Sequence, residues 1–210
     1  ERALEQGAAL YVGVGLEVTD LEARGATGRG RLLNANAEAL PFDDASFDLA
    51  LSLSTFEHFR DGARVLRELY RVLRPGGSAL VSFEPVWTAS YGHHLHHRPP
   101  VARLIPPWAH LLWGPEQMRA ALAPAWPKDA PGSLDEAVHW TYHGDQINRL
   151  PLPALRAQIE QGPLAVEWLV PLRDGTPEAR PELAAYLARV LPWSAEDLLS
   201  VGLSALLTRR

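Results

Sequence analysis

Short apolar runs alternate with helical or polar segments along the first 85 residues. Four runs predict strands, at residues 10–14, 31–35, 47–53 and 79–83. The third run, at 47–53, is apolar enough to be a central strand. Strands and helices that alternate in this way form a parallel sheet with helices on both faces. The sequence therefore predicts an α/β fold.

One helix is expected between the third and fourth strands. Asp61 can accept hydrogen bonds from its first free amides. Its predicted buried face carries Ala63, Leu66, Leu69, Tyr70 and Leu73. Pro75-Gly76-Gly77 should end this helix, because proline blocks its continuation and glycine permits a positive φ on the way into a strand.

The later part of the chain differs in character. Residues 84–131 are crowded with proline, histidine and tryptophan, which predicts a long insertion after the strand at 79–83. Further elements are expected as helices at 115–122, 152–161 and 181–191, a strand at 165–170, and an apolar run at 201–207 that returns to the sheet edge. We predict a single domain over residues 1–210, with residues 85–150 as a lid or substrate-binding insertion.

Composition narrows the function classes. The 210 residues are 47% hydrophobic, enough for one sizeable core. A net charge of −5 without a strongly basic run disfavours nucleic-acid binding and suits a small-molecule partner. The chain has no cysteine, no leading secretory signal and no apolar stretch long enough to span a membrane, so we expect a cytoplasmic protein without disulfides. Oligomeric state is left open.

Four motifs occur in order along the predicted α/β region. They are Asn36-Ala37-Glu38-Ala39-Leu40-Pro41-Phe42, Ser46-Phe47-Asp48-Leu49, Glu57-His58, and Arg71-Val72-Leu73-Arg74-Pro75-Gly76-Gly77. This series resembles the class I S-adenosylmethionine-dependent methyltransferases that act on small molecules, closely over residues 1–85. The resemblance implies a doubly wound, mostly parallel Rossmann-like sheet. It also implies S-adenosylmethionine as cofactor, S-adenosylhomocysteine as product, and methyl transfer by in-line displacement.

The resemblance also implies a set of cofactor contacts. Asn36 and Ala37 match the segment that reaches the adenine ring, although the family carries Asp where this chain has Asn36. An amide oxygen can still accept a hydrogen bond there, and the alternative is a turn residue that satisfies local backbone. Leu53 and Ser54 match positions bordering the sulfonium and methionine part, with strand-end packing as the alternative; His58 is placed with this set.

Gly13-Val14-Gly15 is not the glycine-rich cofactor loop, because too few residues separate it from Asn36 for a whole crossover. The run at 10–14 instead resembles the family's second strand, which ends in a ribose-binding acidic residue. Gly15 occupies that position, and Glu17 is the candidate ribose contact, or else a surface carboxylate. By this resemblance we expect the first strand and its glycine loop to lie outside this sequence. A degenerate relative with a binding or regulatory role and no turnover is the alternative function.

Two histidine features are candidates for chemistry. Glu57 and His58 form either an acid–base pair or the hydrogen-bonded start of the next helix, and we favour the structural role. His93 and His94 follow a strand end where the methyl group would lie, so we predict them as general base or substrate-positioning residues for a hydroxyl acceptor. The alternatives are a metal site that adds His96, which the spacing disfavours, and a loop whose histidines contact backbone or solvent. No metal is predicted.

The tryptophans of the later chain have two interpretations. An indole can wall an apolar or sugar-like pocket and orient the ligand through its N–H, or it can be part of the core. The residues concerned are Trp87, Trp108, Trp113 and Trp140. For any single one of them the core interpretation is favoured.

Overall fold

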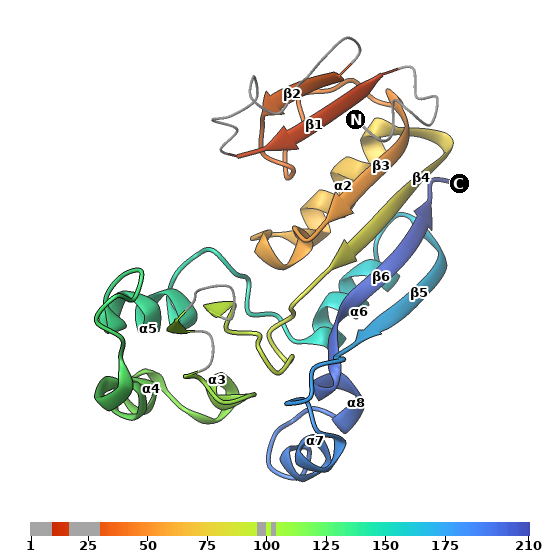
Figure 1. Ribbon diagram of the computed structural model, residues 1–210. Helices are drawn as coiled ribbons and strands as arrows, with labels where there is room; N and C mark the ends of the chain where they lie inside the picture. Colours follow the sequence, from red (N-terminus) through yellow and green to blue (C-terminus); the bar gives the residue numbers. More distant parts are fainter. Residues whose placement is uncertain (1–9, 17–29, 96–99, 102–103) are drawn as a thin grey trace.

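The computed structural model describes residues 10–16, 30–95, 100–101 and 104–210 (Figure 1). The candidate ribose contact Glu17, and His96 of the alternative metal site, lie outside the described residues. None of the described helices is long and apolar enough to cross a membrane.

The described residues form two sheets, one of two strands and one of four (Figure 1). β1 (Tyr11–Gly15) and β2 (Gly30–Asn34) pair in parallel as a two-stranded sheet. The larger sheet has the order β3-β4-β6-β5. Its members are β3 (Phe47–Leu53), β4 (Leu73–Phe83), β5 (Ala165–Arg173) and β6 (Ser200–Thr208). All the predicted strands are confirmed, and the α/β architecture is Rossmann-like.

The strand order corrects two expectations. β3 pairs only with β4 among the described strands, so it is an edge and not a central strand. β6 was expected at the sheet edge, but it lies between β4 and β5 and is antiparallel to both. Its alternate residues Leu203, Ala205 and Leu207 are fully buried, which explains the interior position because an edge strand would leave more of them in water.

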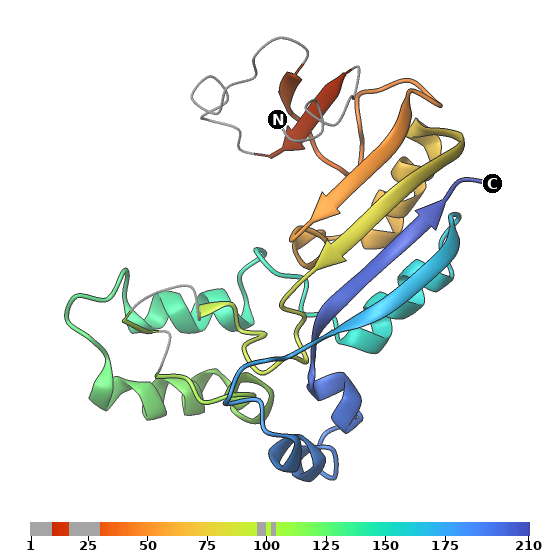
Figure 2. The same ribbon diagram turned by 45° about the vertical axis from the view of Figure 1, so that its right-hand side comes forward.

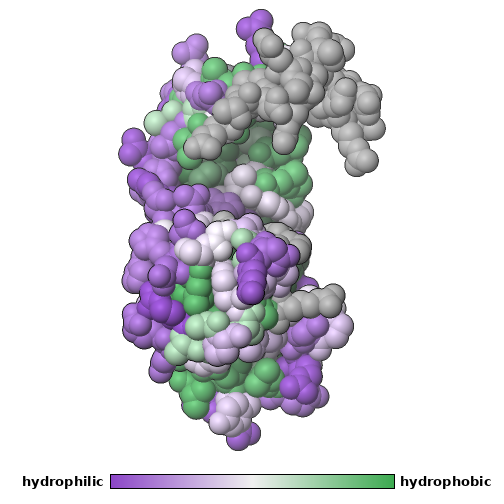
Figure 3. Space-filling view, turned by 60° about the vertical axis from the view of Figure 1, so that its left-hand side comes forward, coloured by the Kyte–Doolittle hydropathy of each residue, from purple (hydrophilic) through white to green (hydrophobic). Residues whose placement is uncertain are grey.

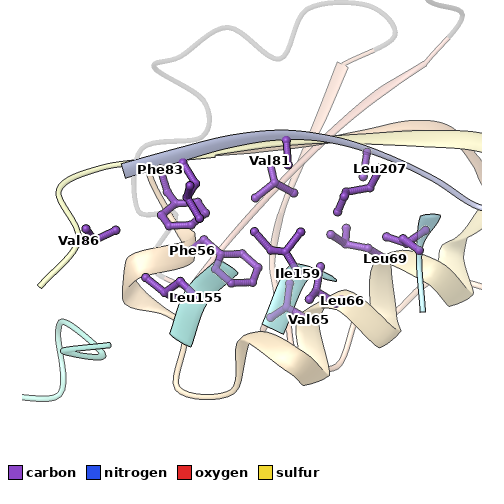
Figure 4. Packing of buried hydrophobic residues seen from close by; sticks show 14 of the residues in the cluster. Phe56, Val65, Leu66, Leu69, Val81, Phe83, Val86, Leu155, Ile159 and Leu207 are labelled. Atoms are coloured by element: carbon purple, nitrogen blue, oxygen red, sulfur yellow. The ribbon is translucent and has the colours of Figure 1, made fainter. Parts of the chain in front are cut away.

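Helices α2 (Gly62–Val72) and α6 (Leu152–Glu160) cover one face of the larger sheet. Figure 4 shows their apolar side chains meeting those of β4 and β6. The core between these layers includes Phe56, Leu66, Phe83, Ile159 and Leu207. As predicted, Asp61 caps α2, and its carboxylate accepts a hydrogen bond from the Arg64 amide at 2.8 Å. The helix ends at Val72, and Gly76 adopts φ +80° within β4.

The opposite sheet face is not covered by helices of the described residues, contrary to the expectation of two covered faces. Leu49, Leu51 and Leu53 of β3 are each at least half exposed there, and Trp168 of β5 is also exposed. Hydrophobic surface is visible in the upper half of the molecule in Figure 3. The alternation of β3 therefore points one apolar row away from α2.

The segment after β4 folds at one end of the sheet (Figure 2). It contains α3 (Ala109–Leu112), α4 (Pro115–Leu122), η4 (Ala123–Ala125) and α5 (Leu134–Tyr142). Leu95, Ile105, Met118, Leu122 and Val138 belong to a separate hydrophobic cluster there. The sequence predicted α4 with these bounds, but α5 was missed although Ser133 and Glu136 form a capping box.

A third cluster surrounds Trp108. The helices α7 (Pro181–Leu187) and α8 (Ala195–Leu198) contribute Ala184, Leu187 and Leu198 to it. Trp108 is fully buried and its indole N–H donates to the carbonyl oxygens of Thr88 and Leu198, both at 3.2 Å. Trp108 is therefore a core residue of this third cluster. Through it the insertion packs against α7 and α8.

Candidate functional site

The candidate site begins where β3 ends. Leu53 is the last residue of the strand and its side chain is more than half exposed. Ser54 follows in a left-handed conformation, with φ 49°, and its amide donates to the Ser82 carbonyl oxygen at 2.8 Å. Non-glycine residues rarely adopt this conformation, and such strained residues cluster at functional sites.

The short helix η1 (Phe56–His58) comes next and is anchored by its first residue. Phe56 is fully buried and its ring stacks on that of Phe83, with centroids 5.1 Å apart. This packing fixes the direction of the two residues that follow. Glu57 is thereby held inside the protein, while His58 lies at the surface.

Glu57 is a buried carboxyl group. Its exposed fraction is 3%, and its Oε2 has no hydrogen-bond partner among the described residues. Burial raises the pKa of Glu57 to about 7, and the nearby Glu84 charge adds to the shift, against backbone hydrogen bonds from Glu57 and Glu84 that lower it. A carboxyl group with such a pKa can exchange a proton near neutral pH.

His58 lies beside this carboxyl group. Its Nε2 is 3.8 Å from Glu57 Oε1. Its Nδ1 contacts the carbonyl oxygen of Gln146 at 2.5 Å, and because a carbonyl only accepts, Nδ1 carries the proton. The lone pair of a neutral His58 ring is therefore on Nε2, toward Glu57. The ring also packs edge-on against that of His94, at 5.4 Å between centroids.

The two predicted catalytic histidines lie in different environments. His94 adopts φ 58°, and its Nε2 donates to the Pro85 carbonyl oxygen at 2.8 Å. His93 is fully buried, and its Nδ1 accepts a hydrogen bond from the Leu95 amide at 3.0 Å. The geometry brings His94 together with Glu57 and His58, and directs His93 into the insertion beside His110.

Glu57 and His94 line a narrow crevice between the strand ends and the segment that follows α5. Its other walls are Pro85, Trp87, Gly92, Ile147, Asn148 and Arg149. Asn148 is held by its Nδ2, which donates to the Phe56 and Phe59 carbonyl oxygens at 3.0 and 3.3 Å. Arg149 has φ 52°, and its guanidinium donates to the carbonyl oxygens of Thr141 and Ile147.

A wider depression of about 460 Å³ lies on the outer side of α5. It is lined by Asp135, Glu136, His139, Trp140, Gly144, Asp145 and Gln146. Trp140 links the two hollows, because its ring centroid is 6.1 Å from that of His94. Of the tryptophans with two interpretations, Trp87 and Trp140 therefore border hollows, and Trp108 belongs to the core.

The adenine-binding candidates lie in a turn after β2. Asn36 Oδ1 accepts a hydrogen bond from the Glu38 amide at 2.9 Å, which is the local turn contact that the sequence offered as an alternative. Ala37 packs against the main core. Glu38 Oε1 accepts from the amides of Arg60 and Asp61, both at 3.1 Å, so this turn adjoins the segment after His58.

Some site residues could not be identified from the sequence. Asn148 and Arg149 carried no motif. Glu57 was assigned a structural role because carboxylates are common at helix starts, and its burial depends on residues distant in the chain. The capping box at Ser133 would have predicted α5, and with it the position of Trp140. Within the described ranges, histidine and carboxylate side chains form no group of three suited to a metal ion.

Residues 2–81 match the protein family described as a methyltransferase domain. An uncharacterized methyltransferase of Mycobacterium sp. (strain JLS) is 40% identical over 85 residues, which are 40% of this chain and 33% of that protein. A ubiquinone/menaquinone biosynthesis C-methyltransferase of Cronobacter sakazakii (strain ATCC BAA-894) is 37% identical over 87 residues, 39% of this chain and 35% of that protein. The chain spans about a third of the length of these relatives.

Solved structures share the fold. An S-adenosylmethionine-dependent methyltransferase from Mesorhizobium loti superposes with a TM-score of 0.55 at 23% identity, covering 99% of this chain and 84% of that one. Geranyl diphosphate C-methyltransferase from Streptomyces coelicolor A3(2) superposes with a TM-score of 0.55 at 14% identity, covering 100% and 66%. At these identities the likeness concerns the architecture, which agrees with the predicted Rossmann-like fold.

Proposed function

We propose that this chain, a class I S-adenosylmethionine-dependent methyltransferase by its residues 2–81 and its fold, methylates a hydroxyl group of a small-molecule acceptor. One observation carries the proposal. Titratable side chains, Glu57 and His94, line a crevice at the carboxyl ends of β3 and β4, where ligands bind in doubly wound folds. A hydroxyl acceptor must lose a proton during transfer, and a titratable group at this edge of the sheet would take it.

The described residues fit the adenosyl part of the cofactor. Leu53 offers an exposed apolar side chain at the strand end, and Asn36 Oδ1 retains a second lone pair beside the one used by the Glu38 amide. With Ala37, Ser54 and His58 they would hold it along this edge of the sheet, and Glu17 would contact the ribose. When bound, the cofactor supplies an electrophilic methyl group on a sulfonium.

The insertion at residues 85–150 would act as the lid or acceptor-binding part of the domain. In-line displacement requires that the nucleophile is aligned and that water is excluded. His94 lines the crevice and is held by the Pro85 carbonyl, so we assign it to positioning the acceptor. His93 is fully buried, and its contribution would be to support this loop. The wider depression beside Trp140 offers volume for a small organic acceptor.

The test is cofactor binding followed by turnover. Isothermal titration should detect binding of both S-adenosylmethionine and S-adenosylhomocysteine. A panel of phenols, alcohols, amines and activated carbon acids, followed by mass spectrometry, should then give a methyl ether as the main product. If neither S-adenosylmethionine nor S-adenosylhomocysteine binds, the proposal is overturned. Methylation confined to carbon acids or amines would overturn the hydroxyl assignment.

A second candidate is a binding or regulatory protein on the same fold. It is favoured by the local hydrogen bond that already engages the Asn36 side chain. This candidate predicts binding of a partner or nucleotide without any methylated product. Turnover with any acceptor in the panel would exclude it.

A further inference from the structure

The segment between α5 and α6 contacts η1 chiefly through one residue, Asn148. The Asn148 amide donates a hydrogen bond to the Glu57 carbonyl oxygen at 2.9 Å. Its side-chain Nδ2 donates to the carbonyl oxygens of Phe56 and Phe59, at 3.0 and 3.3 Å. A helix as short as η1 leaves carbonyl groups at its end without partners in the helix itself. Asn148 therefore supplies partners to this end of η1 and fixes its position.

The orientation of the Asn148 side chain is set by partners of both kinds. Carbonyl oxygens only accept hydrogen bonds, so the atom that faces Phe56 and Phe59 must be the donor Nδ2. Oδ1 accepts from the Leu150 amide at 3.0 Å, and that amide only donates. An aspartate in place of Asn148 would keep the contact with Leu150 and lose both donors to η1.

The two residues before Asn148 in this segment also contact the η1 region. The Gln146 carbonyl oxygen accepts the proton of His58 Nδ1 at 2.5 Å. The Asp145 carboxylate forms an ion pair with the Arg60 guanidinium. Both of these contacts lie at the surface, so each contributes less to stability than the partly buried contacts of Asn148.

The residue after Asn148 holds the segment to α5. The Arg149 guanidinium donates to the carbonyl oxygens of Thr141 and Trp140, at 2.8 and 3.3 Å. These carbonyl groups belong to the last turn of α5, where a cation is favourable. The same short stretch of chain is thus bonded to η1 through Asn148 and to α5 through Arg149.

This stretch lies between the two regions to which ligands are assigned above. Leu53 and Ser54, proposed for the cofactor, directly precede η1 in the chain. The depression proposed for the acceptor is lined by Trp140 of α5 and by Asp145 and Gln146 of the segment itself. The position of the depression relative to the strand ends therefore depends on the contacts between the segment and η1.

We infer that Asn148 is the positioning residue that holds the acceptor-binding depression in register with the cofactor edge of the sheet. It acts through η1 and touches neither ligand itself. The inference rests on the proposed function and adds to it a residue that no sequence motif identified. In-line displacement requires alignment of the methyl donor with the nucleophile, so a shift of about 1 Å between the two regions would lower the rate by about 100-fold.

The first experiment measures amide hydrogen exchange by mass spectrometry and needs no acceptor. In Asn148→Asp, peptides covering residues 55–60 and 143–150 should both exchange at least about fivefold faster, because the bonds between the two segments are lost. The matched control is Ser194→Ala, which removes the bond from the Asp197 amide to Ser194 Oγ in α8 and should leave both peptides unchanged. Faster exchange at 143–150 without any change at 55–60 would overturn the inference.

The second experiment separates positioning from stability and uses the acceptor that the mass-spectrometric panel identifies. At a temperature where each variant is folded, Asn148→Asp and Asn148→Ala should lower kcat at least about tenfold, with the affinity for S-adenosylhomocysteine changed less than about threefold. Asn148→Ser retains one hydroxyl donor and is the milder variant, so its decrease should be smaller. Ser194→Ala should keep the kcat of the unsubstituted chain.

Two results would contradict different claims. An unchanged kcat in the folded Asn148 variants would overturn the inference and leave the proposed function in place, as would an equal decrease in Ser194→Ala. If the unsubstituted chain fails to bind S-adenosylhomocysteine, the proposed function is overturned, and the inference that rests on it falls as well.

Discussion

Arg71 Nη2 donates a hydrogen bond to the carbonyl oxygen of Leu40 at 2.9 Å, across 31 positions of the chain. Nη1 of the same side chain donates to the Phe42 carbonyl oxygen at 2.6 Å, and Glu68 holds the guanidinium from its own helix. Two of the four sequence motifs are thus joined by one side chain. This contact requires the loop after β2 to reach the last turn of α2, which constrains the spacing of the two motifs.

Arg71→Lys should therefore destabilise the fold although it keeps the charge. An ammonium group cannot reproduce the planar set of donors, and the carbonyl oxygens of Leu40 and Phe42 lose partners. We expect a loss of about 2 kcal/mol in the free energy of unfolding, measured by urea denaturation. Arg74→Lys is the control, because its ion pair with Asp48 is exposed; a change of about 0.5 kcal/mol or less is expected there. Equal effects of both changes would contradict the structural role of Arg71.

Glu57 should make stability fall as pH rises. Its pKa is raised from 4.5 to about 7 by burial, so the folded state binds a proton more tightly than the unfolded state does. The favourable contribution is complete below pH 4.5 and is lost as pH rises to about 7. In Glu57→Gln this loss, up to about 3 kcal/mol, should disappear. Chemical denaturation at several pH values measures it, and an unchanged slope would contradict the burial.

His110 should have the opposite effect and make stability fall as pH falls. Burial lowers its pKa from 6.5 to about 4, against a hydrogen bond to the Trp87 carbonyl that raises it. The unfolded state then binds the proton that the folded state does not, so stability is lost as pH falls from 6.5 to 4. The two slopes oppose each other between pH 4.5 and 6.5 in the wild type. His110→Gln should expose the Glu57 slope there, and a flat profile in that variant would refute the assignment.

Substitutions at His93 and His94 should have different effects, one on stability and the other on turnover. His94→Ala should lower kcat by about tenfold to a hundredfold, with little change in S-adenosylmethionine affinity, because the residue orients groups in the crevice. His93→Ala should instead lower the free energy of unfolding by about 2 kcal/mol, since its ring is fully buried and accepts the Leu95 amide. Steady-state kinetics and urea denaturation of both variants decide this; a purely kinetic effect at His93 would reverse the assignment.

Local sequence patterns predicted the elements whose formation depends on residues near one another in the chain. The apolar runs gave every strand, and Pro115 with the following periodicity gave α4 with its observed bounds. The place of β6 depends on pairing with β4 and β5, far away in sequence, and no local pattern encodes it. The exposed face of β3 could not be predicted either, because its alternating leucines, Leu49, Leu51 and Leu53, are the pattern that a strand covered by helices would also have.

The positions of some candidate residues followed from strand ends, while their roles stay predictions. Leu53 is the last residue of β3, Ser54 follows it directly, and His58 comes soon after. The burial of Glu57 could not be predicted, since Asn148 closes over Phe56 from 92 positions away. A single sequence carries no signal for such an approach, and only the folded insertion brings the two segments together.

The interior position of β6 has a consequence for the order in which the molecule assembles. Ala79 of β4 pairs with Leu207 of β6, so the sheet closes only across the whole intervening segment of the chain. The entropy cost of closing so long a loop must be met before the pairing contributes any stability, which slows folding. The cluster around Met118 and Val138 unites residues that are near one another in sequence, and its early formation would shorten the effective loop. The insertion would then serve the folding rate of the sheet as well as its chemistry.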